Sequence, residues 1–289
     1  MIETPGYRFG VSQFTTTPWP FERDVERYAA HGVDAIEICE FKLDANDYAR
    51  QLRRVARYGL TVSSVQTRVH ALFPDSLAPQ PSDPAQRLDL MLGAIDRIAP
   101  LVPAGTPFVV ITGSAPDGNC EAVYQYALRA LERLAERAHS YSMRIAFEPL
   151  NPVLFHTDTA LWGLDAGLEL VERVGHEALG LCCDTWNVFR TPEIDAVIRS
   201  CGERIFIVQV SDWRRPRNNA DRRSLGDGVI PTTGLITSIR AGGYDGPYVL
   251  EIFSSTSLGD SLWNSDLDLV LDENITAFDR LWNESVVNA

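Results

Sequence analysis

RIAFEPLN, from Arg144 to Asn151, joins a short apolar run to an acid and a proline. The apolar residues lead directly into Glu148, and Pro149 cannot donate a hydrogen bond to a neighbouring strand. This pattern is typical of a buried parallel strand that ends at a cleft. Parallel barrels and sheets bind ligands at the carboxyl ends of their strands, so Glu148 is a candidate functional residue. The alternative is a carboxylate that is solvated in a turn.

Apolar runs and helical patterns alternate along the rest of the chain. Strands are predicted at residues 7–12, 34–39, 60–66, 108–112, 145–148, 179–183, 204–210 and 248–251. Helices are predicted at residues 21–31, 44–58, 84–98, 121–140, 158–174, 194–200, 233–241 and 266–282. Eight such alternations within 289 residues favour a closed (β/α)8 barrel, the TIM barrel, over an open doubly wound sheet. Because no linker rich in Gly, Ser or Pro divides the chain, residues 1–289 are predicted to form one domain.

The composition argues against several classes of protein. The formal net charge of -13 disfavours nucleic acid as a partner, because nucleic-acid binding depends on clustered cationic side chains. No apolar run approaches the roughly 20 residues that span a bilayer, and the N-terminus lacks a basic and then apolar signal sequence. Five cysteines, none in C-x-x-C spacing, fit reduced thiols better than disulfides or a zinc site. We therefore expect a cytoplasmic protein with no membrane partner.

Oxygen-bearing side chains lie at or near the ends of the last four predicted strands: Glu148, Asp184, Gln209 and Glu251. If the barrel closes, all four point towards one place. Three carboxylates so close together would raise one another's pKa unless a cation lay between them. We therefore predict one divalent cation, and an all-oxygen set of ligands favours Mn²⁺ or Mg²⁺ over Zn²⁺. The alternative is four unrelated side chains at loop edges.

Five motifs carry a family resemblance: AFEPLN at residues 146–151, DTWN at 184–187, VQVSD at 208–212, LGDGVIP at 225–231 and GYDGPYVLEIF at 243–253. Together they resemble the sugar phosphate isomerase/epimerase superfamily, the xylose isomerase-like TIM barrels. The resemblance extends to DSLW at 260–263 and so covers nearly the whole chain. It implies a divalent metal held by Glu148, Asp184, Gln209 and Glu251. In the epimerase and isomerase branch, the two glutamates also serve as acid and base.

Three positions depart from the pattern of the sugar epimerases. The ligand on the seventh strand is usually His and is here Gln209, which is also familiar from the dehydratase branch. The His that often follows the Asp by three residues is here Asn187, which we expect to contact the substrate. Pro152 replaces an Arg that sugar epimerases commonly carry. Each departure weakens the transfer of a sugar-epimerase substrate to this chain.

Further substrate contacts are predicted on the rim of the barrel. His70 follows the third predicted strand and is a candidate to bind a substrate oxygen or donate a proton, with a structural role as the alternative. Five arginines stand at positions 214, 215, 217, 222 and 223, and such a cluster suits the capture of a carboxylate or phosphate. The resemblance favours Arg215, and Arg223 is a second candidate. The alternative is ion pairing with nearby acids or with a second subunit of a homo-oligomer.

The predicted reaction is proton transfer next to a carbonyl group of a small hydroxylated substrate, which could also be anionic. A carboxylate can remove such a proton only if the developing enolate oxygen is stabilised, and a bound cation does this. The first interpretation is a metal-dependent isomerase or epimerase of sugars, sugar phosphates or polyols. The alternative is a dehydratase (lyase) of the 3-dehydroshikimate or inosose type. A non-catalytic barrel or an endonuclease IV-like DNA repair enzyme is less well supported, because the latter needs many histidines and a basic surface.

Overall fold

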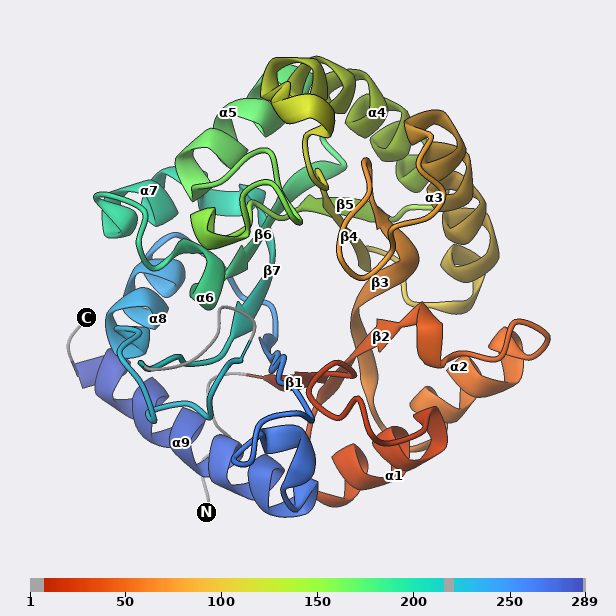
Figure 1. Cartoon of the computed structure of the whole chain (residues 1–289). Coiled ribbons are helices and arrows are strands. Elements are labelled where there is room, and N and C mark those ends of the chain that lie inside the picture. Colours follow the sequence, from red (N-terminus) through yellow and green to blue (C-terminus); the bar gives the residue numbers. More distant parts are fainter. Residues whose placement is uncertain (1–7, 216–220, 288–289) are drawn as a thin grey trace.

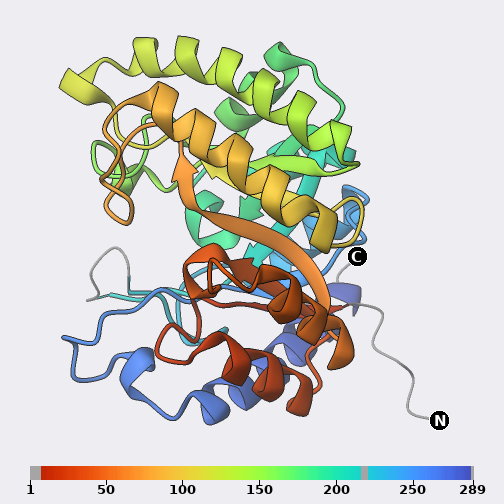
Figure 2. The ribbon, with the colours of Figure 1, turned by 90° about the vertical axis from the view of Figure 1, so that its right-hand side faces the viewer.

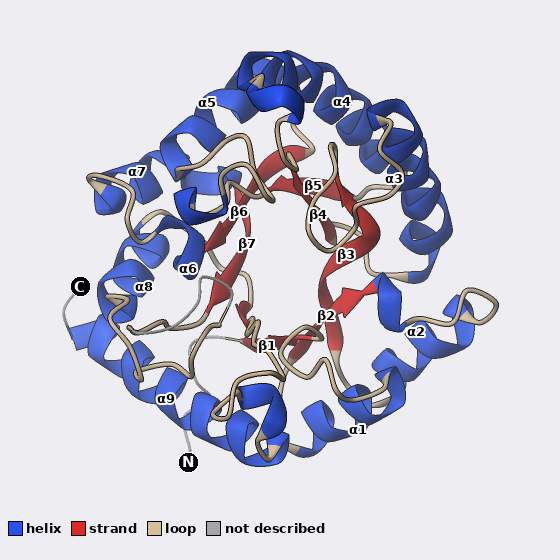
Figure 3. Ribbon diagram, in the orientation of Figure 1, coloured by secondary structure: helices blue, strands red, loops and turns tan. Residues whose placement is uncertain are grey.

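A computed structural model describes residues 8–215 and 221–287, and it confirms the predicted barrel (Figure 1). Eight parallel strands pair in sequence order and close between the first and the last. They are β1 (Phe9–Ser12), β2 (Ala35–Cys39), β3 (Thr61–Ala71), β4 (Pro107–Ile111), β5 (Arg144–Phe147), β6 (Leu179–Asp184), β7 (Ile205–Val210) and β8 (Tyr248–Leu250). The helices form a ring outside the strands (Figure 3). Tyr7, which begins the first predicted strand, lies outside the described residues.

The helices are α1 (Phe21–Ala30), α2 (Tyr48–Arg57), α3 (Pro84–Ile98), α4 (Cys120–Ser140), α5 (Leu164–Val174), α6 (Thr185–Val188), α7 (Ile194–Cys201), α8 (Thr232–Ala241) and α9 (Leu267–Val287). The side view shows α3 and α4 lying next to each other outside the barrel (Figure 2). Across residues 8–215 and 221–287, no helix is both long and apolar enough to cross a membrane. The single domain over residues 1–289 stays a prediction, because both chain ends lie outside the description.

Several boundaries differ from those expected. Helix α5 begins at Leu164 instead of residue 158, because residues 158–163 form a loop in which Asp158 accepts a hydrogen bond from the Ser76 backbone at 2.7 Å. Helix α2 begins at Tyr48 instead of residue 44. Strand β3 continues to Ala71, five residues beyond its predicted end at 66. The short helix α6 was not expected, and it follows β6 directly.

A layer of small and branched side chains fills the barrel below the carboxyl ends of the strands. Val109, Ala146, Cys182, Ile207 and Val249 form one buried cluster, with one residue from each strand between β4 and β8. Side chains alternate between the two faces of a strand, so the residue two positions later shares the inward face. For β5 to β8 those later residues are Glu148, Asp184, Gln209 and Glu251.

Candidate active site

Three carboxylates meet at the carboxyl ends of the strands. Glu148 follows β5, Asp184 ends β6 and Glu251 follows β8, and all three side chains are buried. One oxygen atom of each lies within 4.8 Å of the chosen oxygen of the other two. The structure therefore brings together three of the four residues predicted as ligands, at a spacing that suits a single cation. Their role as ligands stays a prediction.

Arg222 lies against two of these carboxylates. Its Nη1 atom is 2.8 Å from Asp184 Oδ2 and 2.9 Å from Glu251 Oε2. The guanidinium carbon lies 4.9 Å from the ring centre of Trp186 and 5.0 Å from that of Phe253. The Arg222 backbone also donates to the Phe253 carbonyl at 2.8 Å, so the guanidinium is held firmly. The arginine cluster in the sequence was the signal for this contact, but it did not indicate which member enters the site.

Asn187 of α6 orients Glu148. Its Nδ2 atom donates to Glu148 Oε1 at 2.6 Å and to Asp184 Oδ2 at 3.1 Å. Its Oδ1 atom accepts from the Asn151 backbone at 2.9 Å. Asn187 also lines the pocket, and its predicted contact with the substrate stays a prediction.

The three buried carboxylates outnumber the one arginine beside them, and the pKa of each carboxylate is raised. Burial, and then repulsion from Asp184, raises the pKa of Glu148 to about 8. Burial also raises the pKa of Asp184, and it raises the pKa of Glu251 well above its usual value, although Arg222 opposes both shifts. A positive charge between buried carboxylates lowers their pKa values and relieves their mutual repulsion, so this cluster of raised pKa values fits a place for a cation.

Gln209 lies beside the carboxylates, but its amide oxygen faces away from them. Its Nε2 atom donates to Glu251 Oε1 at 3.1 Å and to both oxygens of Glu37 at 3.1 Å. Its Oε1 atom accepts from the Cys182 thiol at 3.0 Å. Coordination of a cation by Gln209 would require the amide to turn, and its role as the fourth ligand stays a prediction.

Glu37 is a fourth buried acid that the sequence reasoning missed. It lies within β2 and accepts hydrogen bonds from Ser64, Gln66 and Gln209. The AIEIC stretch of β2 reads as an ordinary apolar strand with one acid in its centre. The signal was that acid, because a charged residue is almost never fully buried without partners.

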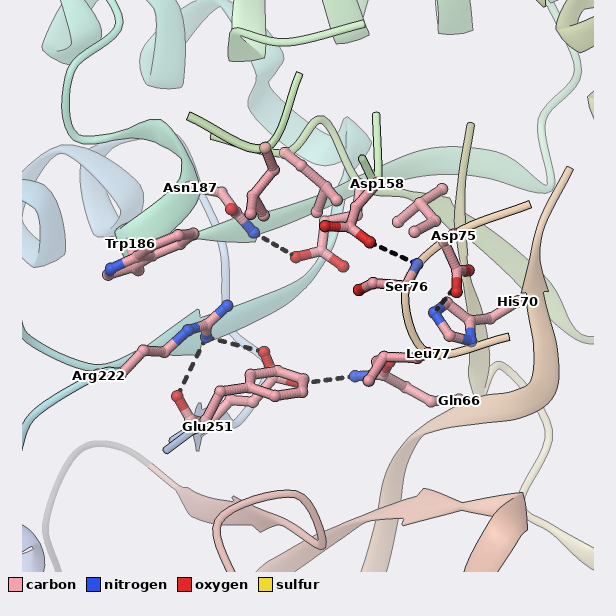
Figure 4. A pocket seen from close by; sticks show the side chains of 15 residues that line it. Gln66, His70, Asp75, Ser76, Leu77, Asp158, Trp186, Asn187, Arg222 and Glu251 are labelled. Carbon is pink, nitrogen blue, oxygen red and sulfur yellow. Dashed lines mark hydrogen bonds and ion pairs between the residues drawn. The ribbon is translucent and has the colours of Figure 1, made fainter. Parts of the chain in front are cut away.

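A pocket opens above the carboxylates (Figure 4). Glu148, Glu251, Arg222 and Asn187 line it together with Trp186 and Phe253. Its other lining residues are Gln66, His70, Asp75, Ser76, Leu77, Ile111, Leu150, Leu154 and Asp158. The pocket therefore combines apolar walls with a few polar groups, as small-molecule sites commonly do.

His70 lines this pocket from β3. Its Nε2 atom lies 3.6 Å from Asp75 Oδ2, and Arg87 Nη2 lies 3.7 Å from the same oxygen. Burial lowers the pKa of His70, and Asp75 opposes that shift. A neutral imidazole can donate and accept hydrogen bonds, so the predicted contact with substrate fits this position and stays a prediction.

The two predicted arginine contacts lie outside the pocket lining. Arg223 is buried, and its guanidinium donates to Asp227 at 3.0 Å and to the Asp260 carbonyl at 3.1 Å. Arg215 is exposed. Their predicted contacts with the substrate stay predictions.

Two curated proteins are similar to this chain in sequence. The 3-dehydroshikimate dehydratase of Pseudomonas aeruginosa is 29% identical over 248 residues, covering 80% of this chain and 36% of the relative. The enzyme of the same name from Pseudomonas putida is 27% identical over 250 residues, covering 80% of this chain and 35% of the relative. The chain thus spans about a third of the length of these relatives.

Solved structures share the fold. Protein SMc04130 of Sinorhizobium meliloti matches with a TM-score of 0.83 and 24% identity, covering 96% of this chain and 98% of that one. IolI, described with a bound zinc atom, matches with a TM-score of 0.79 and 15% identity, covering 96% of this chain and 99% of that one. An L-ribulose 3-epimerase matches with a TM-score of 0.79 and 19% identity, covering 98% of this chain and 96% of that one. The family model described as xylose isomerase-like TIM barrel matches residues 25–274. With the barrel and its strand-end carboxylates, this match shows that the chain belongs to the xylose isomerase-like TIM barrel family.

Proposed function

We propose that the protein is a metal-dependent dehydratase that removes a proton next to a carbonyl group of a small hydroxylated substrate. The observation that carries this proposal is an asymmetry between the two glutamates of the site. It favours the lyase alternative over the isomerase or epimerase that was the first interpretation of the sequence.

Glu251 is held by donors on both of its carboxylate oxygens. Oε1 accepts from Gln66 at 2.6 Å and from Gln209 at 3.1 Å, and Oε2 accepts from Arg222 at 2.9 Å. Three donors fix the orientation of the carboxylate, and the charge of Arg222 opposes the rise in its pKa that burial causes. A group held in this way is poorly suited to swing towards a substrate carbon and back.

Glu148 is less restrained. Its Oε1 atom accepts from Asn187, and no hydrogen bond reaches Oε2 from the residues that the structure describes. The side chain lines the pocket, where it faces the space for a substrate. Glu148 is therefore the better candidate to exchange a proton with the substrate.

The number of free bases bears on the reaction. Epimerisation by two carboxylates requires one proton-transfer group on each face of the carbon. A single mobile carboxylate can remove the proton from carbon and then protonate the departing β-hydroxyl group. The C–H and C–O bonds break, a C=C bond forms, and the proton and hydroxide leave together as water. One glutamate with an oxygen atom open to the substrate thus fits elimination better than epimerisation by two bases.

The residues present fit a hard divalent cation. Glu148, Asp184 and Glu251 supply closely spaced oxygen atoms, and Arg222 neutralises only part of their charge. We propose Mn²⁺ or Mg²⁺, which prefer such oxygen ligands, as the native ion. A bound cation would act as a Lewis acid on the substrate carbonyl and would favour the ionised carboxylates.

The names of the curated relatives support the dehydratase over the epimerase. Both are 3-dehydroshikimate dehydratases, and that substrate class combines a ketone, hydroxyl groups and a carboxylate. The similarity to an L-ribulose 3-epimerase, at 19% identity, concerns the fold. We therefore propose a cyclic hydroxy ketone, with a carboxylate as an optional further group, as the substrate.

The test is incubation with Mn²⁺ in D₂O, using 3-dehydroshikimate, inososes and ketoses as substrates and NMR as the readout. We expect loss of water from a β-hydroxy ketone. Glu148→Gln should lower kcat by about 10³-fold, because it removes the base. Glu251→Gln should mainly raise the Mn²⁺ concentration needed and keep measurable turnover at saturation. Formation of an epimer, or equal loss of kcat in both variants at saturating Mn²⁺, would refute the dehydratase.

A further inference from the structure

Glu37 is fully buried in the barrel wall, and each of its hydrogen-bond donors comes from another strand. Ser64 Oγ donates to Oε2 at 2.7 Å, and Gln66 Nε2 donates to Oε1 at 2.9 Å. Gln209 Nε2 lies 3.1 Å from both oxygens. Strand β2 thus presents an acid to β3 on one side and to β7 across the barrel.

Two of these donors are shared with the candidate active site. Gln66 Nε2 also donates to Glu251 Oε1 at 2.6 Å, a contact drawn in Figure 4. Gln209 Nε2 also donates to Glu251 Oε1, at 3.1 Å. Each amide nitrogen therefore bridges Glu37 and Glu251, using N–H groups that an amide carries in pairs.

We infer that Glu37 is a positioning residue for Glu251, acting through Gln66 and Gln209. An ionised carboxylate only accepts hydrogen bonds, so both glutamines must turn their NH₂ groups towards Glu37. The same NH₂ groups then hold Glu251 Oε1, which leaves Oε2 on the side of Asp184 and Arg222. Glu37 also adds a negative charge close to the carboxylates that face the pocket.

The inference rests on the proposed function, because the expected consequence is tighter binding of the cation. Mutation of a residue that hydrogen-bonds to a metal ligand commonly lowers the affinity of the protein for the metal by 10- to 100-fold. Glu37 does not line the pocket, so its effect reaches the substrate through Gln66 and Glu251, which do. Its substitution should therefore change Mn²⁺ affinity and kcat more than KM at saturating Mn²⁺.

The first test measures Mn²⁺ binding by calorimetry in the Glu37→Gln protein, which keeps the side-chain volume and removes the charge. We expect the affinity to fall by about 10-fold or more. The matched control is Glu40→Gln, a buried acid just beyond β2 that pairs with Tyr48 and Arg97 and not with the pocket. Its Mn²⁺ affinity should stay within about twofold of the wild type. An unchanged affinity in Glu37→Gln, or an equal loss in the control, would overturn the inference.

The second test follows the side-chain NH₂ signals of Gln66 and Gln209 by NMR in the cation-free protein. Both pairs of signals should shift in Glu37→Gln, and signals that stay in place would overturn the inference. This readout separates the two proposals, because a wild-type protein that binds no Mn²⁺ refutes the function and leaves the amide test standing. If Glu37→Gln fails to fold, Glu37→Asp replaces it, because this variant keeps the charge and shortens the side chain. Its Mn²⁺ affinity and its glutamine NH₂ signals are then judged in the same way.

Discussion

Arg222 provides the nearest positive charge for a group of buried acids. It contacts Asp184 and Glu251 directly, and the rings of Trp186 and Phe253 enclose its guanidinium. Removing one partner of a buried ion pair leaves an uncompensated charge in a medium of low dielectric constant. A cation bound nearby would compensate part of that loss. We therefore expect Arg222 to contribute most to the free energy of unfolding when no metal is bound.

Arg222→Gln should lower the free energy of unfolding by about 3 kcal/mol in EDTA, because two buried carboxylates lose their partner. Arg223→Gln is the matched control, since its partner Asp227 is partly exposed, and it should cost about 1 kcal/mol. Denaturant unfolding with and without Mn²⁺ measures both, and Mn²⁺ should restore stability to Arg222→Gln more than to Arg223→Gln. Equal losses in the two variants would contradict this account of the site.

At the scale of elements, the chain that leaves β4 fits closely against the chain that leaves β3. Phe73 donates to the Thr112 carbonyl at 2.8 Å, and Ser114 donates to the Pro74 carbonyl at 2.9 Å. Gly113 lies between these bonds with φ of +76°, and a Cβ atom there would lie 2.0 Å from the Phe73 carbonyl oxygen. This contact places the loop that carries Asp75, Ser76 and Leu77 to the pocket.

Gly113→Ala should therefore destabilise the protein by about 3 kcal/mol or more, since it adds a backbone clash to an unfavourable φ. Gly118 has φ of +72° and open space around its Cβ position, so Gly118→Ala should cost only about 1 kcal/mol. Thermal unfolding of both variants measures the difference. A similar loss of stability in the two would show that the close approach to Phe73 is unimportant.

At the scale of the whole molecule, a buried network ties α1 to the segments that follow the first two strands. Asp24 of α1 accepts from Gln13, Thr16 and Lys42, each at 2.7 Å. Burial raises the pKa of Asp24 to about 6, although Lys42 opposes the shift. Because the folded protein holds this proton more tightly than the unfolded chain, protonation stabilises the fold.

The contribution of Asp24 is present below about pH 4 and is lost as pH rises through about 6. We expect the difference in free energy of unfolding, wild type minus Asp24→Asn, to fall by roughly 3 kcal/mol between pH 4 and pH 7. Denaturant unfolding of both proteins across this range tests the sign. A difference that stays constant, or that rises with pH, would contradict the role of Asp24.

Sequence patterns predicted the barrel because they depend on local periods. A strand alternates its faces every two residues, so the apolar runs and the acids that end them can be read from neighbouring positions. This placed Glu148, Asp184 and Glu251 at one end of the barrel before their distances were known. Boundaries were less accurate where a loop is fixed by a distant partner, as at Asp158 and Ser76.

Local sequence determined the alternation of elements, the acidic ends of the late strands and the family. Tertiary structure alone decided that Arg222 contacts the carboxylates, that the Gln209 amide turns its nitrogen to Glu37, and that Glu37 belongs to the site. The physical reason is that these contacts join residues far apart in the chain. Their geometry depends on how all eight strands close, and hydrogen-bond direction is set by every neighbour at once.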